Sequence, residues 1–140
     1  MQIIEADKSI RSDLNVFYVE QGYHSDWSTI ERAFVAMGNN NIIGSVKVEK
    51  SNGISILRGM YISNEFQGRN LGTQLIKHIE PILNETISYC MPFSHLEKFY
   101  AQIGFIKVNL CKYPDYLRQR YRSYEKEGYK IIPMMRDITK

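Results

Sequence analysis

A strand that passes through a glycine-containing loop directly into a helix is the feature of this sequence that most constrains its fold. Residues 54–63 predict the strand, and residues 71–83 predict an amphipathic helix because apolar side chains recur every three or four positions. A further strand is predicted at residues 86–91. Since a helix that connects two neighbouring strands of one sheet places them parallel, the chain is expected to contain a parallel pair.

The other predicted elements form a mostly antiparallel sheet with helices on both faces. Turns rich in asparagine and glycine at residues 38–41 and 51–53 separate β-branched runs and predict an antiparallel meander. Pro81 is expected to end or kink the helix that contains it. The fold class is therefore mixed α/β, in one domain over residues 1–140. The predicted strands are 2–5, 32–37, 42–50, 54–63, 86–91, 105–110 and 130–137, and the predicted helices are 9–23, 71–83, 94–103 and 116–126.

Composition and charge exclude several classes of protein. Hydrophobic residues make up 44% and charged residues 24% of the chain, which excludes disorder, collagen and coiled coil. The net charge of +3 permits an anionic ligand but is too small to predict a nucleic-acid surface. No apolar run approaches the roughly 20 residues that span a bilayer, so no membrane partner is expected. With no apolar leader and with Cys90 and Cys111 at a spacing that suits no metal, we expect a cytoplasmic protein without a metal site.

The loop between the strand and the helix predicts an anion-binding site. Backbone N–H groups at a helix start are unpaired, and the positive end of the helix dipole lies there. Gly68 and Gly72 have no side chain that would keep a phosphate from the backbone. The loop has neither the Gly-Lys-Ser/Thr ending of a Walker loop nor the Gly-x-Gly-x-x-Gly of a dinucleotide-binding fold. The alternative is that both glycines serve only a tight turn and close packing of the helix on the sheet.

A second segment further along the chain favours the anion-binding interpretation. There a short predicted helix ends at Gly104 and turns directly into a strand. Asn70 stands in the loop, and asparagine tolerates a positive φ better than most residues. The loop Gln67-Gly68-Arg69-Asn70-Leu71-Gly72 and the turn Phe99-Tyr100-Ala101-Gln102-Ile103-Gly104-Phe105 together resemble the two motifs of the GNAT superfamily of N-acetyltransferases, which usually has a glycine where this chain has Asn70.

The resemblance implies a GNAT-like fold with a site for acyl-CoA, normally acetyl-CoA as the co-substrate. The site would lie where the strand that ends at Ile62 and the strand that starts at Thr86 splay apart. Loop amides would bind the pyrophosphate, and the backbone of Tyr61 and Ile62 would pair with the pantetheine. The donor-binding residues so implied are Tyr61, Ile62, Gln67, Gly68, Arg69, Asn70, Leu71, Gly72 and Thr73.

The same resemblance gives Tyr100 the role of protonating the leaving thiolate. A backbone N–H near Ile62 is the expected oxyanion donor, since the sheet would hold it rigidly. Packing alone is the alternative role for Tyr100, because the chain has 10 tyrosines. No general base is assigned. The candidates by position are Glu20, His24, Asp26, Glu31 and Glu49.

Aromatic and basic residues of two segments are candidates for the acceptor side. Aromatic walls suit an amine through cation–π contact. The alternative for the C-terminal helix is an ordinary buried stripe with solvated arginines. Arg58 in the central strand would either bind an acceptor carboxylate or pair with Glu49 across the sheet. The candidate wall residues are Tyr18, Tyr23, His24, Asp26 and Trp27, and then Tyr113, Tyr116, Arg118, Arg120, Tyr121, Arg122 and Tyr124.

The function that these observations predict is an acetyl-CoA-dependent acyltransferase, an N-acetyltransferase. A neutral primary amine of a small molecule or peptide would attack the thioester directly. One alternative is a non-catalytic acyl-CoA-binding or regulatory module, which Asn70 and the missing base would suit. Another is an acetyltransferase that acts on a protein or an aminoacyl-tRNA. The acceptor, the length of the acyl group and the choice between a monomer and a homodimer are left open.

Overall fold

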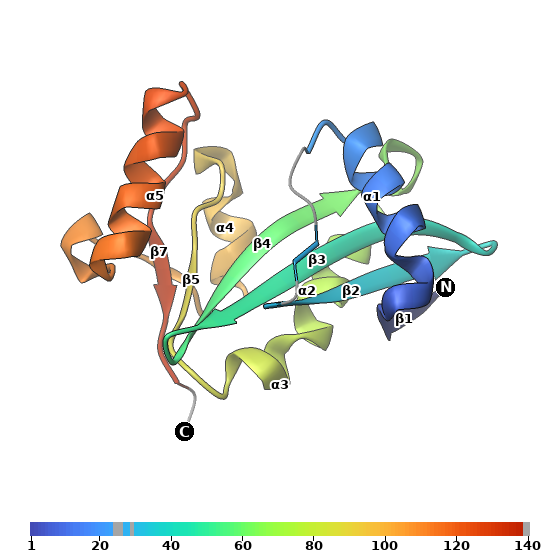
Figure 1. Ribbon diagram of the computed structural model, residues 1–140, viewed down its shortest axis with the longest axis horizontal. Coiled ribbons are helices and arrows are strands. Elements are labelled where there is room, and N and C mark those ends of the chain that lie inside the picture. The colour runs from blue at the N-terminus through green and yellow to red at the C-terminus, as the bar shows by residue number, and fades with distance from the viewer. Residues whose placement is uncertain (24–26, 29, 139–140) are drawn as a thin grey trace.

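A computed structural model describes residues 1–23, 27, 28 and 30–138 of the chain. Its centre is one seven-stranded sheet with the order β1-β2-β3-β4-β5-β7-β6 (Figure 1). Neighbouring strands are antiparallel except β4 and β5, which are parallel, so the prediction of a mostly antiparallel sheet with one parallel pair is confirmed. The strands are β1 Gln2–Glu5, β2 Glu31–Gly38, β3 Asn41–Ser51, β4 Ile54–Ile62, β5 Ser88–Cys90, β6 Ile106–Lys107 and β7 Met134–Arg136.

Helices cover both faces of the sheet. The face toward the viewer in Figure 1, here called the front face, carries α1 and α5, and the back face carries α2 and α4. No helix in the described part of the chain is long and apolar enough to cross a membrane. The α-helices are α1 Arg11–Glu20, α2 Leu71–His78, α3 Glu80–Leu83, α4 Glu97–Ala101 and α5 Asp115–Lys126, and short 3-10 turns lie at Lys8–Ile10, Asn64–Phe66, Ser94–Leu96 and Leu110–Lys112.

Several elements are shorter than the sequence predicts, for local reasons. The predicted helix 71–83 is two helices, because Pro81 in the first turn of α3 has no N–H to continue the hydrogen bonds of α2. The predicted strand 105–110 is reduced to β6, since Asn109 accepts a hydrogen bond from the N–H of Cys111 at 2.9 Å and turns the chain. These changes shorten elements but leave their order as predicted.

The back face of the sheet is closed by apolar packing. Val46 and Val48 of β3 and Leu57 of β4 point to this face and are buried. Leu75 of α2 and Leu83 of α3 are fully buried in the same cluster. Because burial of such side chains is the main favourable term in folding, this cluster fixes α2, and with it the loop before α2, against β3 and β4.

Two irregularities of β4 distinguish it from the other strands. It pairs with β5 only through Ser55–Leu57 and Ser88–Cys90, and beyond these residues the two strands diverge (Figure 1). On its other side β4 pairs with β3 through a bulge, in which Gly59 and Met60 lie opposite the single residue Val46. The second half of β4 therefore borders an opening in the sheet.

Candidate functional site

The loop from β4 to α2 folds back onto the end of β4. Gln67 Nε2 donates to the carbonyl of Ile62 at 3.0 Å and to Asn64 Oδ1 at 3.2 Å. Gly68 has a φ of +78°, and no atom lies within 4 Å of the position that its Cβ would take. Gly68 is therefore required by the turn and not by packing. The Arg69 guanidinium lies 5.3 Å above the ring of Phe66 in the same loop.

The start of α2 suits an anion. Asn70 adopts the left-handed conformation with φ 60° and ψ 14°, which asparagine tolerates better than most residues. Its side chain makes no capping hydrogen bond, so the N–H groups of Leu71, Gly72 and Thr73 are open to a ligand or to water. These donors and the positive end of the helix dipole would suit an anionic ligand, and they lie beside the divergence of β4 and β5.

Gly72 serves packing, unlike Gly68. A Cβ at Gly72 would lie 3.3 Å from Phe99 Cζ and 3.8 Å from Ile62 Cγ1. Its hydrogen therefore lets α2 approach both α4 and the end of β4. Gly72 therefore takes part in the close packing that the sequence analysis gave as the alternative role, and the same close approach brings the start of α2 next to the opening in the sheet.

Tyr100 lies on α4, behind the opening. Its ring packs at right angles to Phe99, with a centroid separation of 5.0 Å, and to Phe105, at 6.3 Å. Burial raises the pKa of the Tyr100 hydroxyl well above its ordinary value, and Cys90 and Tyr61 add to the rise. Tyr100 is thus a buried, protonated phenol close to the divergence of β4 and β5.

Aromatic rings border the opening from the front. The rings of Tyr23 and Tyr61 lie 5.2 Å apart. Burial raises the pKa of Tyr61, and Tyr23 and then Tyr129 raise it further, so Tyr129 approaches from beyond α5. Tyr129 in turn packs with Tyr124 of α5 at 6.2 Å. One aromatic pair, Tyr23 and Tyr61, therefore lies on the α1 side and another, Tyr124 and Tyr129, on the α5 side.

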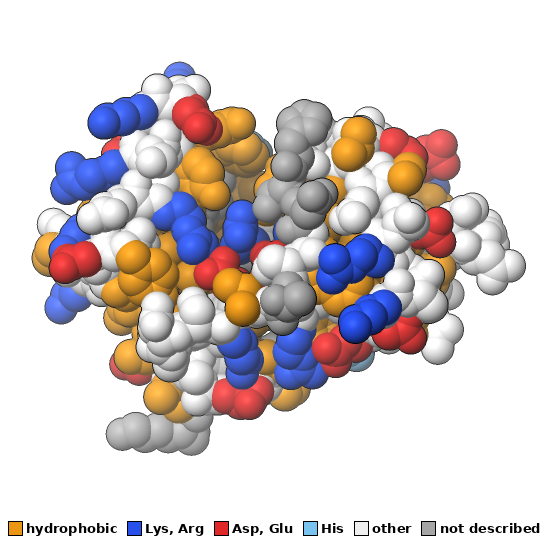
Figure 2. Space-filling view, viewed as in Figure 1, with side chains coloured by type: hydrophobic (Ala, Val, Ile, Leu, Met, Phe, Trp, Pro, Cys, Tyr) orange, Lys and Arg blue, Asp and Glu red, His pale blue; other side chains and the backbone are white. Residues whose placement is uncertain are grey.

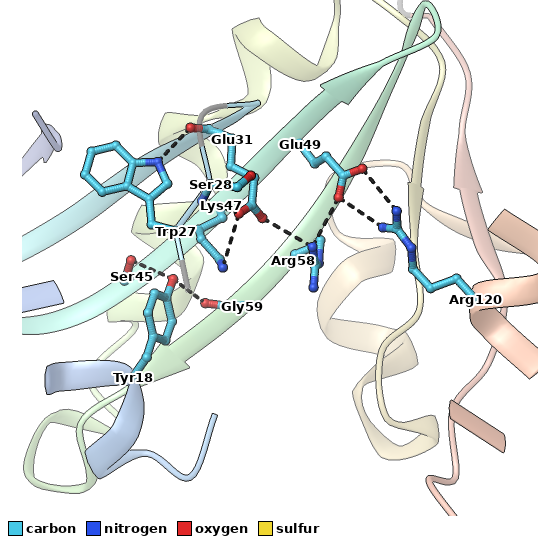
Figure 3. A network of polar contacts seen from close by, with 10 residues as sticks. All are labelled: Tyr18, Trp27, Ser28, Glu31, Ser45, Lys47, Glu49, Arg58, Gly59 and Arg120. Atoms are coloured by element: carbon cyan, nitrogen blue, oxygen red, sulfur yellow. Dashed lines mark hydrogen bonds and ion pairs between the residues drawn. The ribbon is translucent and has the colours of Figure 1, made fainter. Parts of the chain in front are cut away.

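Among the described residues, five charged side chains form a connected network on the front face (Figure 3). Arg58 Nη1 donates to Glu49 Oε1 at 3.1 Å and lies 3.5 Å from Glu31 Oε2. Lys47 Nζ lies 3.5 Å from Glu31 Oε1. Arg120 donates through Nη1 and Nη2 to both oxygens of Glu49, at 3.0 and 3.2 Å. These contacts join β2, β3, β4 and α5.

The Glu49 carboxylate of the network is held in its ionised form. Burial alone would raise the pKa of Glu49, but the hydrogen bond and charge of Arg120, together with Arg58, lower it below its ordinary value. Burial alone would lower the pKa of Arg58, whereas Tyr23, Glu31 and other neighbours raise it. At neutral pH Glu49 therefore acts as a charge partner and is a poor candidate for the general base.

A buried hydroxyl holds the bulge of β4. Tyr18 Oη lies 2.9 Å from Ser45 Oγ and 2.9 Å from the carbonyl of Gly59 (Figure 3). Lys47 Nζ lies 5.2 Å from the centre of the Tyr18 ring. Gly59 has a φ of +60°, and its Cβ would lie 3.1 Å from both Lys47 Cε and Tyr18 Oη. The bulge therefore needs glycine and is fixed by Tyr18.

Several predicted wall residues have structural roles instead. Trp27 is buried, and its Nε1 donates to the carbonyl of Glu31 at 2.7 Å, so it anchors a turn. Tyr113 donates to the carbonyl of Cys90 at 2.7 Å, and Tyr121 to that of Ile131 at 2.9 Å. The buried-stripe alternative thus applies to most of α5, while Arg120 joins the network. His24 and Asp26 lie outside the described residues.

Two of the predicted arginines form ion pairs within the protein. Arg58 pairs with Glu49, as one of the two alternatives for Arg58 predicts. Arg118 pairs with Asp115 one turn earlier on α5 and contributes nothing to the network.

The sequence analysis did not predict that Lys47, Ser45 and Gly59 would lie at this part of the front face. A lysine inside the apolar run of β3 was the available signal for Lys47, since a buried lysine requires partners.

Comparison with known proteins identifies the architecture. Residues 29–107 match the family model described as an acetyltransferase (GNAT) domain. The fold is similar to a GNAT-family acetyltransferase from Staphylococcus aureus Mu50, with a TM-score of 0.69 and 17% identity over 99% of each chain. It is also similar to the ribosomal-protein-S18-alanine N-acetyltransferase of Escherichia coli, with a TM-score of 0.70 and 14% identity over 99% of this chain and 94% of that one.

A larger enzyme contains a similar domain. N-acetylglutamate synthase from Neisseria gonorrhoeae, solved with coenzyme A and N-acetyl-glutamate, gives a TM-score of 0.74 and 15% identity over 99% of this chain and 35% of that one. No curated protein matches the sequence. In the described part of the chain no group of three or more His, Cys, Asp or Glu side chains could hold a metal ion.

Proposed function

Because the chain belongs to the GNAT acetyltransferase family, we propose that it transfers an acetyl group from acetyl-CoA to a primary amine of a small molecule or peptide. The observation that carries the proposal is the position of the α2 start, with its open N–H groups, beside the divergence of β4 and β5. A coenzyme A complex of the Neisseria enzyme, which has a similar domain, supports coenzyme A as the ligand.

The proposed donor site combines the loop and the end of β4. Amides at the start of α2 bind the pyrophosphate, and the exposed backbone edge of β4 pairs with the pantetheine. The bulge at Gly59 and Met60 turns the following backbone toward the opening, which supports an oxyanion donor near Ile62. The proposed donor-binding residues are Tyr61, Ile62, Gln67, Gly68, Arg69, Asn70, Leu71, Gly72 and Thr73.

In the proposed reaction the amine nitrogen attacks the thioester carbon, an oxyanion forms, and the C–S bond then breaks to release the thiolate of coenzyme A. We assign Tyr100 to the sulfur. Because burial raises its pKa, Tyr100 would stabilise the thiolate by a hydrogen bond more readily than by giving up its proton. The proton lost by the acetylated nitrogen passes to solvent, and the thiolate is protonated from solvent.

We assign no general base. Glu31 and Glu49 are ion-paired, with side chains only 1% and 4% exposed. Glu20 is exposed at the end of α1. The amine is therefore proposed to arrive neutral from the small unprotonated fraction in solution. The cytoplasm is the proposed compartment, where the free Cys90 and Cys111 would stay reduced.

The proposal is tested by thiol release from acetyl-CoA with a panel of small amines and short peptides. The expected result is release that requires the amine, saturates with both substrates and yields an acetylated amine by mass spectrometry. Binding of acetyl-CoA without release for any amine would instead support the non-catalytic module. Salt-sensitive retention of RNA would support an aminoacyl-tRNA as the acceptor. Absence of acetyl-CoA binding would contradict the proposal.

A further inference from the structure

Charge is buried on the back face of the sheet as well as on the front. On the front face, charged side chains border a hollow near the centre (Figure 2). On the back face, the side chain of Arg136 of β7 is only 4% exposed and contacts helices instead of solvent. Among the described residues Arg136 is the only buried arginine. The proposed reaction gives it no role.

Arg136 connects the ends of two helices. Its Nε donates to the carbonyl of Ile103, just beyond α4, at 2.6 Å. Its Nη2 donates to Asn84 Oδ1, at the end of α3, at 2.7 Å and to Glu80 Oε2 of α3 at 3.4 Å. Since α3 directly follows α2, Arg136 links the helix that carries Tyr100 to the helices that follow the loop before α2.

Arg136 is a costly residue at this position if only stability is considered. Its Nη1 is buried, and none of the described residues accepts a hydrogen bond from it. Glu80 is 40% exposed, so their ion pair compensates little of the cost of burying the charge. Met134, two residues earlier on the same face of β7, is buried and apolar. The value of Arg136 therefore lies in the geometry that its hydrogen bonds impose.

The contact with Ile103 lies at the turn that ends α4. The carbonyl of Tyr100 accepts from the N–H groups of Ile103 and Phe105, both at 3.3 Å, and Gly104 has a φ of +95°. This closure is typical of a Schellman motif. A carbonyl at a helix end has no partner within the helix, and the helix dipole favours a cation there. Arg136 supplies both a donor and a positive charge to this end of α4.

The position of this turn determines the position of Tyr100. Tyr100 belongs to the last turn of α4, and its ring packs on Phe105, which follows the same turn. Burial raises the pKa of the Tyr100 hydroxyl, and Cys90 of β5 and Tyr61 of β4 raise it further, so the hydroxyl lies within electrostatic reach of both diverging strands. A group that acts through one hydrogen bond loses much of its effect when it is displaced by about 1 Å.

We propose that Arg136 is a positioning residue for acetyl transfer: it holds the Ile103 carbonyl and thereby keeps the Tyr100 hydroxyl where it stabilises the leaving thiolate. The inference rests on the proposed function and on the assignment of Tyr100 to the sulfur. Arg136 acts through Tyr100 and contacts neither substrate. Its loss is therefore expected to slow the breaking of the C–S bond without weakening the binding of acetyl-CoA or the amine.

The first arm of the test measures kcat and both KM values with the best amine of the panel. Arg136→Met removes the guanidinium and keeps an unbranched side chain. It is expected to lower kcat about 10-fold with both KM values unchanged, since a misplacement of about 1 Å can cost up to about 100-fold. Arg136→Lys keeps the charge and can donate to the Ile103 carbonyl, so it is expected to recover part of the loss.

Leu117→Ala is the matched control for lost stability. Leu117 is fully buried in a separate apolar cluster on the front face, under α5. Its truncation is expected to lower the melting temperature but to keep kcat, when all variants are assayed well below their melting temperatures. The control separates a general loss of stability from displacement of Tyr100.

The second arm repeats Arg136→Met in a Tyr100→Phe background. If Arg136 acts through the Tyr100 hydroxyl, the kcat of the double variant is expected to equal that of Tyr100→Phe within about 2-fold, because the positioned group is already absent. An effect on the structure at large would instead multiply the two losses.

The third arm does not depend on activity. Tyrosine labelled with ¹³C at Cζ reports the surroundings of each phenol, and the Tyr100 resonance is assigned by its absence in Tyr100→Phe. This resonance is expected to shift in Arg136→Met and to stay in place in Leu117→Ala.

The outcomes are distinct. A lower kcat at constant KM, together with non-additive losses and a shifted Tyr100 resonance, supports the inference. Wild-type kcat in Arg136→Met or Tyr100→Phe, multiplied losses in the double variant, or an unmoved resonance overturns it while acetyl transfer stands. Failure of every amine overturns the proposed function, and this inference with it. If melting shows that Arg136→Met does not fold, Arg136→Lys takes its place in all three arms and decides in the same way.

Discussion

The two faces of β3 are both buried, but one is packed by apolar side chains and the other by ion-paired side chains. Behind β3, Val46 and Val48 pack on Leu75 in a wholly apolar cluster. In front of the same strand, Lys47 and Glu49 are as deeply buried but are matched to charged partners. Because side chains alternate along a strand, neighbouring residues of β3 belong to these two environments.

The two faces are therefore expected to respond differently to substitution. An apolar cluster tolerates changes in proportion to the volume removed. In an ion-paired cluster, removal of one side chain leaves the charge of its partner buried without compensation, which lowers stability. Replacement of both partners by apolar side chains restores much of that stability. The back face fixes the loop before α2, whereas the front face holds specific charged groups in place.

The largest expected effect is loss of a network carboxylate. Glu31→Gln is expected to reduce the free energy of unfolding by about 3–5 kcal/mol, because the carboxylate that pairs with the buried ammonium of Lys47 and with Arg58 is removed. The double variant Glu31→Leu with Lys47→Met should recover much of this loss. Urea denaturation measures both.

Leu75→Ala provides the matched control on the back face. It is expected to lose about 2–5 kcal/mol, and a second truncation beside it should add to the loss. A double variant at Glu31 and Lys47 that is less stable than either single variant would show that the two faces do not differ in the proposed way.

A kinetic effect is expected on the donor side. Tyr100→Phe removes one oxygen and keeps the ring contacts with Phe99 and Phe105. Turnover should fall by about 10- to 100-fold, the scale for loss of a hydrogen bond to a charged group, while acetyl-CoA affinity changes little. Tyr89→Phe, on β5 against Tyr113, is the control and should leave turnover unchanged. Equal turnover in Tyr100→Phe and wild type would assign Tyr100 to packing.

A smaller effect is expected at the bulge. Tyr18→Phe removes the hydroxyl that donates to Ser45 Oγ and to the carbonyl of Gly59. The free energy of unfolding should fall by about 1–2 kcal/mol. The substitution should also lower turnover, because the backbone that follows the bulge is less firmly held. Tyr121→Phe removes a comparable hydrogen bond on α5 and should lose stability without loss of turnover. If both variants affect turnover alike, Tyr18 has no special role.

The smallest effect is a dependence on pH. The pKa of Glu49 is below its ordinary value of 4.5 in the folded protein, so its carboxylate stabilises the fold above that pH, and this stabilisation is lost as pH falls through the folded-state value. The stability gap between wild type and Glu49→Gln should therefore narrow from pH 7 to pH 3. A gap that is constant or widens on acidification would contradict the ion pairing.

The sequence predicted the strand, loop and helix around residues 54–83 better than the charged network of the front face, for a physical reason. The loop Gln67–Gly72 and the helix after it are contiguous, so their spacing carries the whole signal. The network contains Lys47 and Arg120, which are far apart in the chain. No local sequence pattern predicts that they belong to one network.

The bulge at Gly59 was also beyond prediction. An isolated glycine in a strand is compatible with a bulge or with close approach of another group, and only the pairing register distinguishes them. Strand ends were overestimated because Asn109 stops β6 through a side-chain hydrogen bond, which propensity does not capture.

The most direct test of the donor site is a titration of ¹⁵N-labelled protein with acetyl-CoA, followed by amide chemical shifts. The largest shifts are expected at Gly68, Gly72 and Thr73 of the loop and α2 start, and at Tyr61 and Ile62 of β4. Amides of Lys47 and Glu49, which face the acceptor side, should change far less. Absence of shifts, or shifts concentrated on the front network instead of the loop, would contradict a donor site at the start of α2.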